Sequence, residues 1–431
     1  MKRSFFLACI MACALCAVPL QAGSRVIVRV QGGTDALTTI CGVLNCTIAE
    51  SIGDPQGQLF VVTSNLVDTA TLIQQLLNSS GVVDCEPDLV AQAADASNGP
   101  PAALNDTTPV TYHGSTVPEG YVDQPATQIL RLSYAQASLK VSGSGTVAVI
   151  DTGVDPNHPA LVSVLLRGYD FTRDQNGADE TQDLSLSDPP SSGSANQVNS
   201  NTYANVDQST AAVVDGQSEY SDFGHGTMVA GIIHLVAPSA LILPLKAFKS
   251  DGTGYNSDIL RAIYFAVREN ATVINMSFSL ASYSQEIKNA IEFAHFMGVI
   301  CVAAAGNNGQ ETLTYPAAYQ GLVMGVASTT NTDQRSSFSN YGSQLVWVAA
   351  PGEGVVTTYP FGMYAAAWGT SFSAPWVSGT AALLGQMSWW CDEHDAAGSV
   401  AHAVPLGSDL GNGRLDIYQA AYAWRQQVDP D

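Results

Sequence analysis

The hydrophobic positions of residues 25–92 follow two alternating patterns. Three segments have strand-like spacing or β-branched runs, and the two segments between them have helical spacing. The strand-like segments are 25–30, 58–63 and 82–89, and the helix-like segments are 34–44 and 67–77. The order of strand, helix, strand, helix and strand predicts a small α+β sandwich.

From about residue 125 the apolar runs are separated by longer helical patterns. One helix is predicted at Ser257, which is a residue type that caps helices, and another from Ser284 to Met297, where Gly298 ends the pattern. The apolar strands are predicted at 146–150, 240–248, 272–278, 299–305, 322–327 and 345–350. Strands that alternate with helices predict an α/β domain whose mainly parallel sheet is flanked by helices and buried on both faces.

Two stretches lack apolar periodicity. Residues 93–124 are dominated by Ala, Asn, Pro, Thr and Gly, which predicts an exposed linker that proteases can cut. Residues 172–222 are rich in Asp, Ser, Asn, Gln and Gly and interrupt the α/β pattern, so they are predicted to form a long surface insertion. The sequence contains no repeat of fixed period.

The first residues have the pattern of a secretory signal peptide. Lys2 and Arg3 precede an apolar stretch over residues 5–18, and Ala22 offers a small residue before a cleavage site. We therefore expect residues 1–22 to be removed and the protein to be secreted into the medium or a periplasm. A lipid anchor at Cys13 is the alternative, although the apolar run before it is short. No later segment has 18 uninterrupted apolar residues, so no membrane span is expected.

The charge and the cysteines narrow the class of protein further. The formal net charge is −22 at pH 7, which excludes nucleic-acid binding because a phosphate backbone requires a basic surface. Cys41 and Cys46 can close a small loop in an oxidising compartment, and Cys301 is predicted to be buried in an apolar strand. Residues 391–394 (Cys-Asp-Glu-His) include metal-binding types, but so close a cluster is more often a polar turn.

Three short segments contain residues suited to catalysis. Asp151 ends a buried strand and precedes a glycine turn, which is where ligands gather in parallel sheets. His225 stands between two glycines, so its imidazole is unhindered and can transfer protons near neutral pH. Ser371 stands where a loop becomes an apolar helix, whose N-terminus favours an oxyanion. Taken singly, Asp151 can serve only to cap a turn and Ser371 only to cap a helix, while His234 is predicted to be packed rather than catalytic.

Together, an Asp, a His and a Ser in this order on one α/β domain predict a catalytic triad. The serine would be the nucleophile, the histidine its general base and acid, and the aspartate the group that orients the imidazole. This order differs from that of chymotrypsin-like and α/β-hydrolase enzymes. An esterase or lipase would also need a Gly-x-Ser-x-Gly elbow, which Ser371 lacks.

These segments resemble the three signatures of the subtilisin-like (subtilase) serine peptidases. The matching segments are Asp151-Thr152-Gly153, His225-Gly226-Thr227 and Gly369-Thr370-Ser371, the last with Pro375 four residues on. A fourth segment, 304–309, is similar to the family's oxyanion-hole segment. The resemblance covers about residues 125–425. It implies a serine endopeptidase that forms an acyl-enzyme, with the Asn307 side chain and the Ser371 backbone N–H as oxyanion donors.

The same resemblance implies how a peptide substrate is held. The substrate would lie as an extended strand between two segments, and backbone pairing of this kind gives affinity with little sequence preference. The implied substrate-binding residues are Gly252, Thr253 and Gly254 on one side, Ser277, Phe278 and Ser279 on the other, and Ala304, Gly306 and Ala317. Relatives often have glycine at Ser279 and Ala317, so we expect a narrowed first pocket that prefers small or medium P1 side chains.

Residues 23–92 look similar to the family's N-terminal propeptide, which implies a ferredoxin-like α+β domain that acts as intramolecular chaperone and inhibitor. The expected organisation is a signal peptide over 1–22, a propeptide over 23–92, a linker with the maturation site over 93–124, and a peptidase domain over 125–431 that carries the insertion 172–222.

Some positions depart from the family's pattern. Met228 and Trp376 stand where many relatives have histidine, and the segment 231–238 is too short for the loop that relatives use to bind calcium. We therefore expect no cofactor in the chemistry, and a structural calcium ion lacks support. A non-catalytic relative that uses the cleft or the insertion for binding is the alternative function. The loss of a triad residue would favour it, and the three residues and Asn307 are all present.

Overall fold

The computed structural model describes residues 23–92, 101–184, 205–206, 220, 222–388 and 390–429. The predicted signal peptide, the start of the predicted linker and much of the predicted insertion lie outside the described residues. Contacts divide the chain into two compact units. Unit 1 comprises Met1–Ser51 and Gln58–Pro87, and unit 2 comprises Ile52–Gly57 and Asp88–Asp431.

Unit 1 is a four-stranded antiparallel sheet with two helices. Its elements are β1 (Ser24–Val30), α1 (Gly33–Leu44), β2 (Thr47–Ser51), β3 (Leu59–Ser64), α2 (Thr69–Leu77) and β4 (Val82–Pro87), and the strand order is β2-β3-β1-β4. Alternate residues of β1 pack with Leu37, Leu72 and Leu76 of the helices. The five predicted elements are present, and β2 was missed because its residues are exposed or half-buried. A disulfide joins Cys41 to Cys46, as expected.

Unit 2 is built on an eight-stranded sheet, which confirms the predicted α/β class. The sheet contains β8 (Thr146–Asp151), β9 (Tyr169–Asp170), β10 (Gln175–Asn176), β12 (Leu241–Lys246), β14 (Val273–Met276), β15 (Ile300–Ala304), β16 (Met324–Thr329) and β17 (Val348–Pro351). The strand order is β10-β9-β12-β8-β14-β15-β16-β17, and every pair is parallel except β9 with β10. All six predicted strands belong to it, with Cys301 buried in β15.

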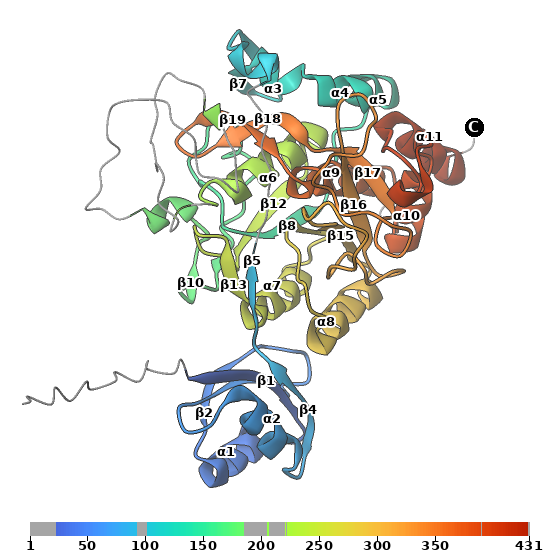
Figure 1. The fold of residues 1–431 in the computed structure, drawn as a ribbon. Coiled ribbons are helices and arrows are strands. Elements are labelled where there is room, and N and C mark those ends of the chain that lie inside the picture. The colour runs from blue at the N-terminus through green and yellow to red at the C-terminus, as the bar shows by residue number, and fades with distance from the viewer. Residues whose placement is uncertain are drawn as a thin grey trace, which may run out of the picture. The chain divides into compact units, whose positions relative to one another are not determined.

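Helices cover both faces of this sheet (Figure 1). On one face α6 (His225–Val236) and α9 (Ala374–Met387) pack on each other and on the central strands, and on the other face α7 (Asn256–Arg268) and α8 (Gln285–Phe296) do the same. Every residue of α6 is buried, so this helix is enclosed on all sides, whereas α7 has one buried face. Ser284 caps α8 and Gly298 follows it, as predicted.

Shorter elements complete unit 2. Its strands are β5 (Val90–Gln92), β6 (Pro109–Tyr112), β7 (Ser115–Pro118), β11 (Asn205–Val206), β13 (Thr253–Tyr255), β18 (Glu353–Tyr359) and β19 (Met363–Trp368). Its helices are α3 (Glu119–Val122), α4 (Pro125–Ile129), α5 (Leu132–Leu139), α10 (Glu393–Val400) and α11 (Ile417–Val428). The 3₁₀ helices are η1 (Ala102–Asn105), η2 (Glu180–Asp183), η4 (Thr370–Phe372) and η5 (Ser408–Leu410). No helix among the described residues is long and apolar enough to cross a membrane.

The prediction of a linker over 93–124 does not hold for residues 101–124, which pack into the core of unit 2. The hydroxyls of Tyr112 and Tyr121 each donate a 2.6 Å hydrogen bond to a carbonyl of α6, at Leu235 and Gly231 respectively. The Gln124 side chain pairs with both backbone groups of Val356. The segment lacks apolar periodicity because a few aromatic anchors in short elements supply its burial.

The prediction of a surface insertion over 172–222 also needs correction at its start. Residues 172–184 are described, and they include β10 and the 3₁₀ helix η2. Glu180 in η2 is fully buried. The start of the insertion is therefore exposed or half-buried at most positions, as predicted, but it places the side chains of Ala178 and Glu180 in the interior.

Candidate active site

Asp151 lies at the carboxyl end of β8, which pairs with β12 on one side and β14 on the other. Four consecutive apolar residues, 147–150, bury this strand in the middle of the sheet, and the Asp151 side chain is almost fully buried. The chain then turns at Gly153, which has a φ of +100°. A Cβ atom there would lie 2.5 Å from the carbonyl oxygen of Ala178, so the turn requires glycine.

His225 is the first residue of α6, and its ring is fully buried beside Asp151. The distance from His225 Nδ1 to Asp151 Oδ1 is 2.7 Å, which is a short hydrogen bond. Two glycines allow this approach. A side chain at Gly224 would collide with the ring of Tyr359, and one at Gly226 would collide with the carbonyl of Gly153.

Ser371 lies in η4, immediately before α9, and is buried. Its hydroxyl donates a 3.0 Å hydrogen bond to the carbonyl of Ser277, and the Ser277 hydroxyl donates a 2.7 Å bond back to the carbonyl of Ser371. The neighbouring Phe372 ring lies 5.2 Å from the His225 ring, measured between centroids. The segment that carries Ser371 therefore lies next to Ser277 and His225.

The carboxamide of Asn307 is oriented by Thr370. Asn307 Oδ1 accepts two 2.9 Å hydrogen bonds, from the Thr370 backbone N–H and from its hydroxyl. The Thr370 hydroxyl oxygen in turn accepts a 3.0 Å bond from the N–H of Gly306. Because the amide oxygen is held by the residue before Ser371, the amide NH₂ group of Asn307 points away from Thr370.

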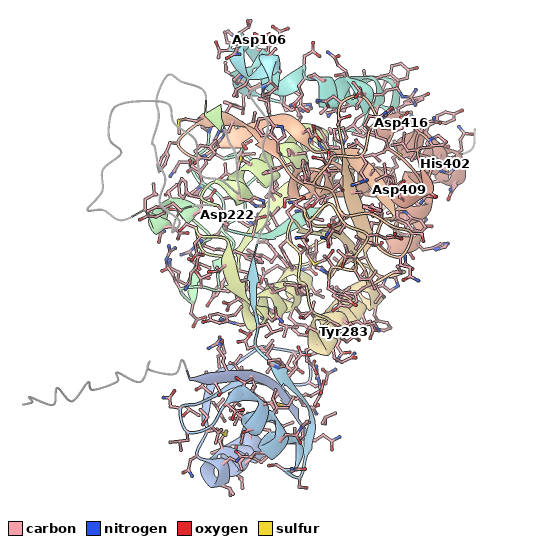
Figure 2. All side chains as sticks on the ribbon, viewed as in Figure 1. Asp106, Asp222, Tyr283, His402, Asp409 and Asp416 are labelled. Carbon is pink, nitrogen blue, oxygen red and sulfur yellow. A yellow bond between two sulfur atoms is a disulfide. The ribbon has the colours of Figure 1, made fainter. Side chains whose placement is uncertain are left out.

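The predicted substrate strand is paired with a segment of the chain itself. β13 runs antiparallel to β5, with Thr253 opposite Gln92 and Gly254 opposite Ala91. Gly252 before β13 packs closely against the carboxylate of Asp222, which is labelled in Figure 2. A peptide in extended conformation is thus already paired with this strand.

Ser257 does not cap α7 as predicted, because the helix begins one residue earlier, at Asn256. Instead, the carboxylate of Asp88 accepts a 3.0 Å hydrogen bond from the Ser257 N–H and a 2.7 Å bond from its hydroxyl. The group that satisfies this helix N-terminus therefore comes from the segment just before β5.

Ser279, which is predicted to narrow the first specificity pocket, lies next to Gly306. A Cβ atom at Gly306 would lie 3.2 Å from Ser279 Oγ and 3.4 Å from Thr314 Cγ2. Leu280 pairs with Tyr315 through two backbone hydrogen bonds, and this pairing holds the segments of Ser279 and Thr314 together. Thr314 carried no signal in the sequence, since it is a threonine in a polar segment.

The other predicted substrate-binding residues are buried more deeply. Ala304 ends β15 and is buried, and Phe278 stacks against Phe248 with ring centroids 4.9 Å apart. Ala317 is buried, and its carbonyl packs behind β16 at Gly325.

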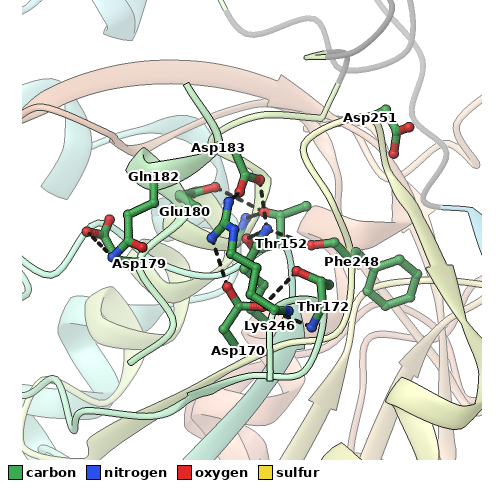
Figure 3. A network of polar contacts seen from close by, with 12 residues as sticks. Thr152, Asp170, Thr172, Asp179, Glu180, Gln182, Asp183, Lys246, Phe248 and Asp251 are labelled. Atoms are coloured by element: carbon green, nitrogen blue, oxygen red, sulfur yellow. Dashed lines mark hydrogen bonds and ion pairs between the residues drawn. The ribbon is translucent and has the colours of Figure 1, made fainter. Parts of the chain in front are cut away.

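A buried network of ion pairs and hydrogen bonds surrounds Lys246 and Thr152, the residue after Asp151 (Figure 3). Lys246 Nζ donates to the carbonyl of Thr152 and that of Phe248, both at 2.7 Å, and forms a 2.8 Å ion pair with Asp183. Burial lowers the pKa of Lys246, and the nearby carboxylates oppose this effect. Burial raises the pKa of Glu180, and its hydrogen bonds and the charge of Lys246 oppose this effect. Sequence analysis missed this network, because Glu180 and Asp183 stand in a stretch of surface-type composition.

The remaining candidates have structural surroundings. His234 is buried against Tyr112, as predicted for a packed residue. Asp392 caps α10. Among the described residues, no group of three or more His, Cys, Asp or Glu side chains is arranged to hold a metal ion.

The buried parallel sheet, with helices on both faces and the Asp151–His225 pair at its carboxyl edge, has the subtilisin-like fold. Comparison with known proteins agrees. The sequence matches the Subtilase family over residues 143–415. The chain therefore belongs to the subtilase family, and it is a serine endopeptidase.

Several relatives match more than half of the chain. The chain is 32% identical over 319 residues to the thermophilic serine proteinase of Bacillus sp. (strain AK1), which covers 74% of this chain and 67% of that protein. It is 33% identical over 291 residues to thermitase of Thermoactinomyces vulgaris, which covers 64% and 89% respectively. The crystal structure of fervidolysin from Fervidobacterium pennivorans has a TM-score of 0.71 at 21% identity, so this likeness shows the fold. It covers 93% of this chain and 61% of the fervidolysin chain.

Proposed function

We propose that the protein is a secreted endopeptidase made as a self-processing zymogen, with Asp151, His225 and Ser371 as its catalytic triad. The observation that carries the proposal is the buried 2.7 Å hydrogen bond between His225 and Asp151, next to the segment of Ser371. Such a bond fixes the imidazole tautomer and stabilises the imidazolium that forms during catalysis. The proposed chemistry requires no cofactor, and one chain supplies all three groups, so we propose a monomer.

The mechanism follows from these groups. The Ser371 side chain rotates about its Cα–Cβ bond, away from the Ser277 carbonyl, and transfers its proton to His225 Nε2 as Oγ attacks the peptide carbonyl carbon. The imidazolium then gives this proton to the leaving amine, which leaves an acyl-enzyme. Water hydrolyses the acyl-enzyme with the same histidine as base. Catalytic hydrogen bonds commonly form only with substrate bound, so the resting bond to Ser277 is compatible with this role.

The oxyanion of the tetrahedral intermediate would be stabilised by two donors. One is the Asn307 amide, which its bonds to Thr370 hold in a fixed orientation. The other is the backbone N–H of Ser371. Donors that are held in place before the reaction need no reorganisation when the charge develops, and the bonds from Thr370 to Asn307 support this role for its amide.

We propose that residues 23–92 are an inhibitory propeptide. The antiparallel pairing of β5 with β13 supports this role, because β5 takes the place of an extended substrate. The bonds from Ser257 to Asp88 anchor the segment just before β5. Because residues 101–124 are packed in unit 2, we propose that maturation cuts N-terminal to Pro101 and that the mature enzyme keeps Tyr112 and Tyr121.

Secretion is supported by the signal-like residues 1–22 and by the disulfide in unit 1, since disulfides persist in oxidising compartments. Substrates would be polypeptides bound as a strand beside β13. Ser279 and Ala317, in place of glycine, favour small or medium P1 side chains.

The first experiment is intact mass and N-terminal sequencing of the full chain expressed in a secreting host. Wild type is compared with Ser371→Ala and with the matched control Ser373→Ala, whose buried hydroxyl has no hydrogen-bond partner among the described residues. We expect wild type and the control to lose the propeptide and to cleave a chromogenic peptide, and Ser371→Ala to keep the propeptide and to be inactive.

Two other outcomes would contradict the proposal. If all three proteins keep residues 23–92 and none cleaves peptide, the function is binding rather than catalysis. If Ser371→Ala loses the propeptide as wild type does, and cleaves peptide at the same rate, Ser371 is not the nucleophile.

A further inference from the structure

Glu180 lies between the two segments that carry Asp151 and His225, although it comes from neither. Its Oε2 atom accepts a 3.0 Å hydrogen bond from the Thr152 hydroxyl and a 2.9 Å bond from the N–H of Gly224. Its Oε1 atom accepts a 3.1 Å bond from the N–H of Thr227 and a further bond from the Thr227 hydroxyl. One buried carboxylate therefore joins the residue after Asp151 to the residues on both sides of His225.

The four hydrogen-bond donors restrict which side chain can occupy position 180. Two are backbone N–H groups that can only donate, and each carboxylate oxygen receives one of them. A glutamine would place an NH₂ group against a backbone donor, whichever way its amide is turned. The site therefore fits an acceptor on both oxygens, which among side chains of this length only ionised glutamate provides.

The same two segments also contact each other directly. The Thr152 hydroxyl oxygen accepts a 2.9 Å bond from the N–H of Gly226, and the Thr227 hydroxyl oxygen accepts a 2.8 Å bond from the N–H of Asp155. Each hydroxyl thus accepts from the opposite segment while it donates to Glu180. Without an acceptor at Glu180, both hydroxyls would lose the bond that fixes their direction.

Lys246 also binds the turn that follows Asp151 (Figure 3). Its ammonium group donates to the carbonyl of Thr152, and the charge of the ammonium is balanced by Asp183, which lies in the same 3₁₀ helix as Glu180. Thr152 is therefore bound through its hydroxyl by Glu180 and through its carbonyl by Lys246. Besides its N–H, the two polar groups of the residue after Asp151 are therefore both bonded to buried charged side chains.

We infer that Glu180 is a positioning residue of the active site, which sets the distance and angle between Asp151 and His225 by binding Thr152, Gly224 and Thr227. The inference rests on the proposed function, because it assigns Glu180 a role through two proposed triad members. Glu180 does not contact substrate. It acts through the hydrogen bond that orients the imidazole, so its loss should affect the chemical step and not substrate binding.

The test compares Glu180→Gln with the matched control Asp179→Asn in the full chain. Asp179 is the adjacent residue. Among the described residues, its side chain accepts hydrogen bonds from Thr181 and Gln182, which belong to the same turn. Both variants remove one carboxylate from the same loop, but only Glu180→Gln disturbs the bonds to the two catalytic segments. The concentration of active enzyme is set by titration with a fluorophosphonate, and kcat and KM are measured with a chromogenic peptide.

We expect Glu180→Gln to lower kcat roughly tenfold to a hundredfold while KM stays within about twofold, as a small misplacement of a catalytic group does. Asp179→Asn should keep the wild-type kcat. A Glu180→Gln enzyme with wild-type kcat, or an equal fall in the control, would overturn the inference. If Glu180→Gln does not fold, Thr152→Val decides the matter, since it removes only the hydroxyl that bridges Glu180 and Gly226, and an unchanged kcat there also overturns the inference.

A spectroscopic readout separates this inference from the proposed function. In the inactive Ser371→Ala chain, the proton in the His225–Asp151 hydrogen bond should give a strongly deshielded ¹H NMR resonance. Adding Glu180→Gln should shift or broaden this resonance, and adding Asp179→Asn should not. If Ser371→Ala proves active, the triad assignment fails. If Ser371→Ala is inactive but the resonance is unmoved by Glu180→Gln, only the role of Glu180 fails.

Discussion

Replacing His234 by leucine should remove a large part of the protein's loss of stability in acid. The imidazole is 2% exposed, lies edge-on against Tyr112, and neither ring nitrogen has a hydrogen-bond partner among the described residues. Burial, and then the nearby imidazoles of His113 and His158, lower the pKa of His234 from 6.5 to about 4. The folded protein therefore keeps this ring neutral where the unfolded chain would protonate it.

The sign and the size follow from that difference. Below pH 6.5 the unfolded state binds more protons than the folded state, so stability is full above pH 6.5 and is lost as the pH falls toward 4. With one pH unit equivalent to about 1.4 kcal/mol, the loss attributable to His234 is about 2 kcal/mol at pH 5 and about 3 kcal/mol below pH 4.

Urea unfolding at pH 7 and pH 5 measures the contribution of His234 to the free energy of unfolding. The Ser371→Ala background prevents self-digestion, and the six tryptophans all lie between residues 347 and 424, so their fluorescence reports unit 2. We expect the fall in unfolding free energy between the two pH values to be about 2 kcal/mol smaller when His234→Leu is added. Leucine loses no hydrogen bond here, because the imidazole makes none in the described structure.

Comparing the two proteins at both pH values cancels the titration of every group that they share, including His113 and His158. The reasoning is refuted if both proteins lose the same free energy between pH 7 and pH 5, within about 0.5 kcal/mol. In that case the His234 site must accept a proton as readily as the unfolded chain does.

Three further predictions concern the catalytic groups and their support. Asn307→Asp keeps both bonds from Thr370 but has no amide to donate, so kcat should fall roughly 10²- to 10³-fold at similar KM, and a fall below about threefold would remove Asn307 from the oxyanion hole. Wild type should prefer small or medium P1 residues in a peptide library. Ser279→Gly should raise kcat/KM for Phe at P1 about tenfold relative to Ala at P1. A wild-type enzyme that already prefers Phe or Tyr about tenfold would contradict the narrowed pocket. Tyr121→Phe removes the bond to the Gly231 carbonyl inside α6 and should lower the free energy of unfolding by about 1 kcal/mol in urea, whereas no loss would mean that residues 101–124 do not brace this helix.

The sequence predicted unit 1 and the sheet of unit 2 well, because periodic burial produces them. Four consecutive residues of β8, 147–150, are apolar, which indicates a strand buried on both faces before any partner strand is known. Ser284 and Gly298 marked the ends of α8 through local backbone chemistry. By contrast, β2 escaped notice, since an edge strand with half-exposed residues has no apolar pattern.

Non-local contacts explain the errors in the prediction. Residues 101–124 have the composition of a linker, yet Tyr112 and Tyr121 bind carbonyls of a helix more than 100 positions away in the chain. Ser257 has the residue type of a helix cap, yet its N–H and hydroxyl bind Asp88. A hydrogen-bond partner that is distant in the sequence cannot be inferred from the residues adjacent to a side chain.

The sequence by itself determined the α/β class, the order of the motifs and the residue types at Asp151, His225, Ser371 and Asn307. Those features are local, because a strand end, a glycine-flanked histidine and a helix start are each specified by a few adjacent residues. Only the tertiary structure decided that His225 is bonded to Asp151, that β5 pairs with β13, and that Glu180 joins the segments that carry Asp151 and His225. Each of these depends on the exact approach of segments distant in the chain, which packing of the whole unit sets and residue spacing does not.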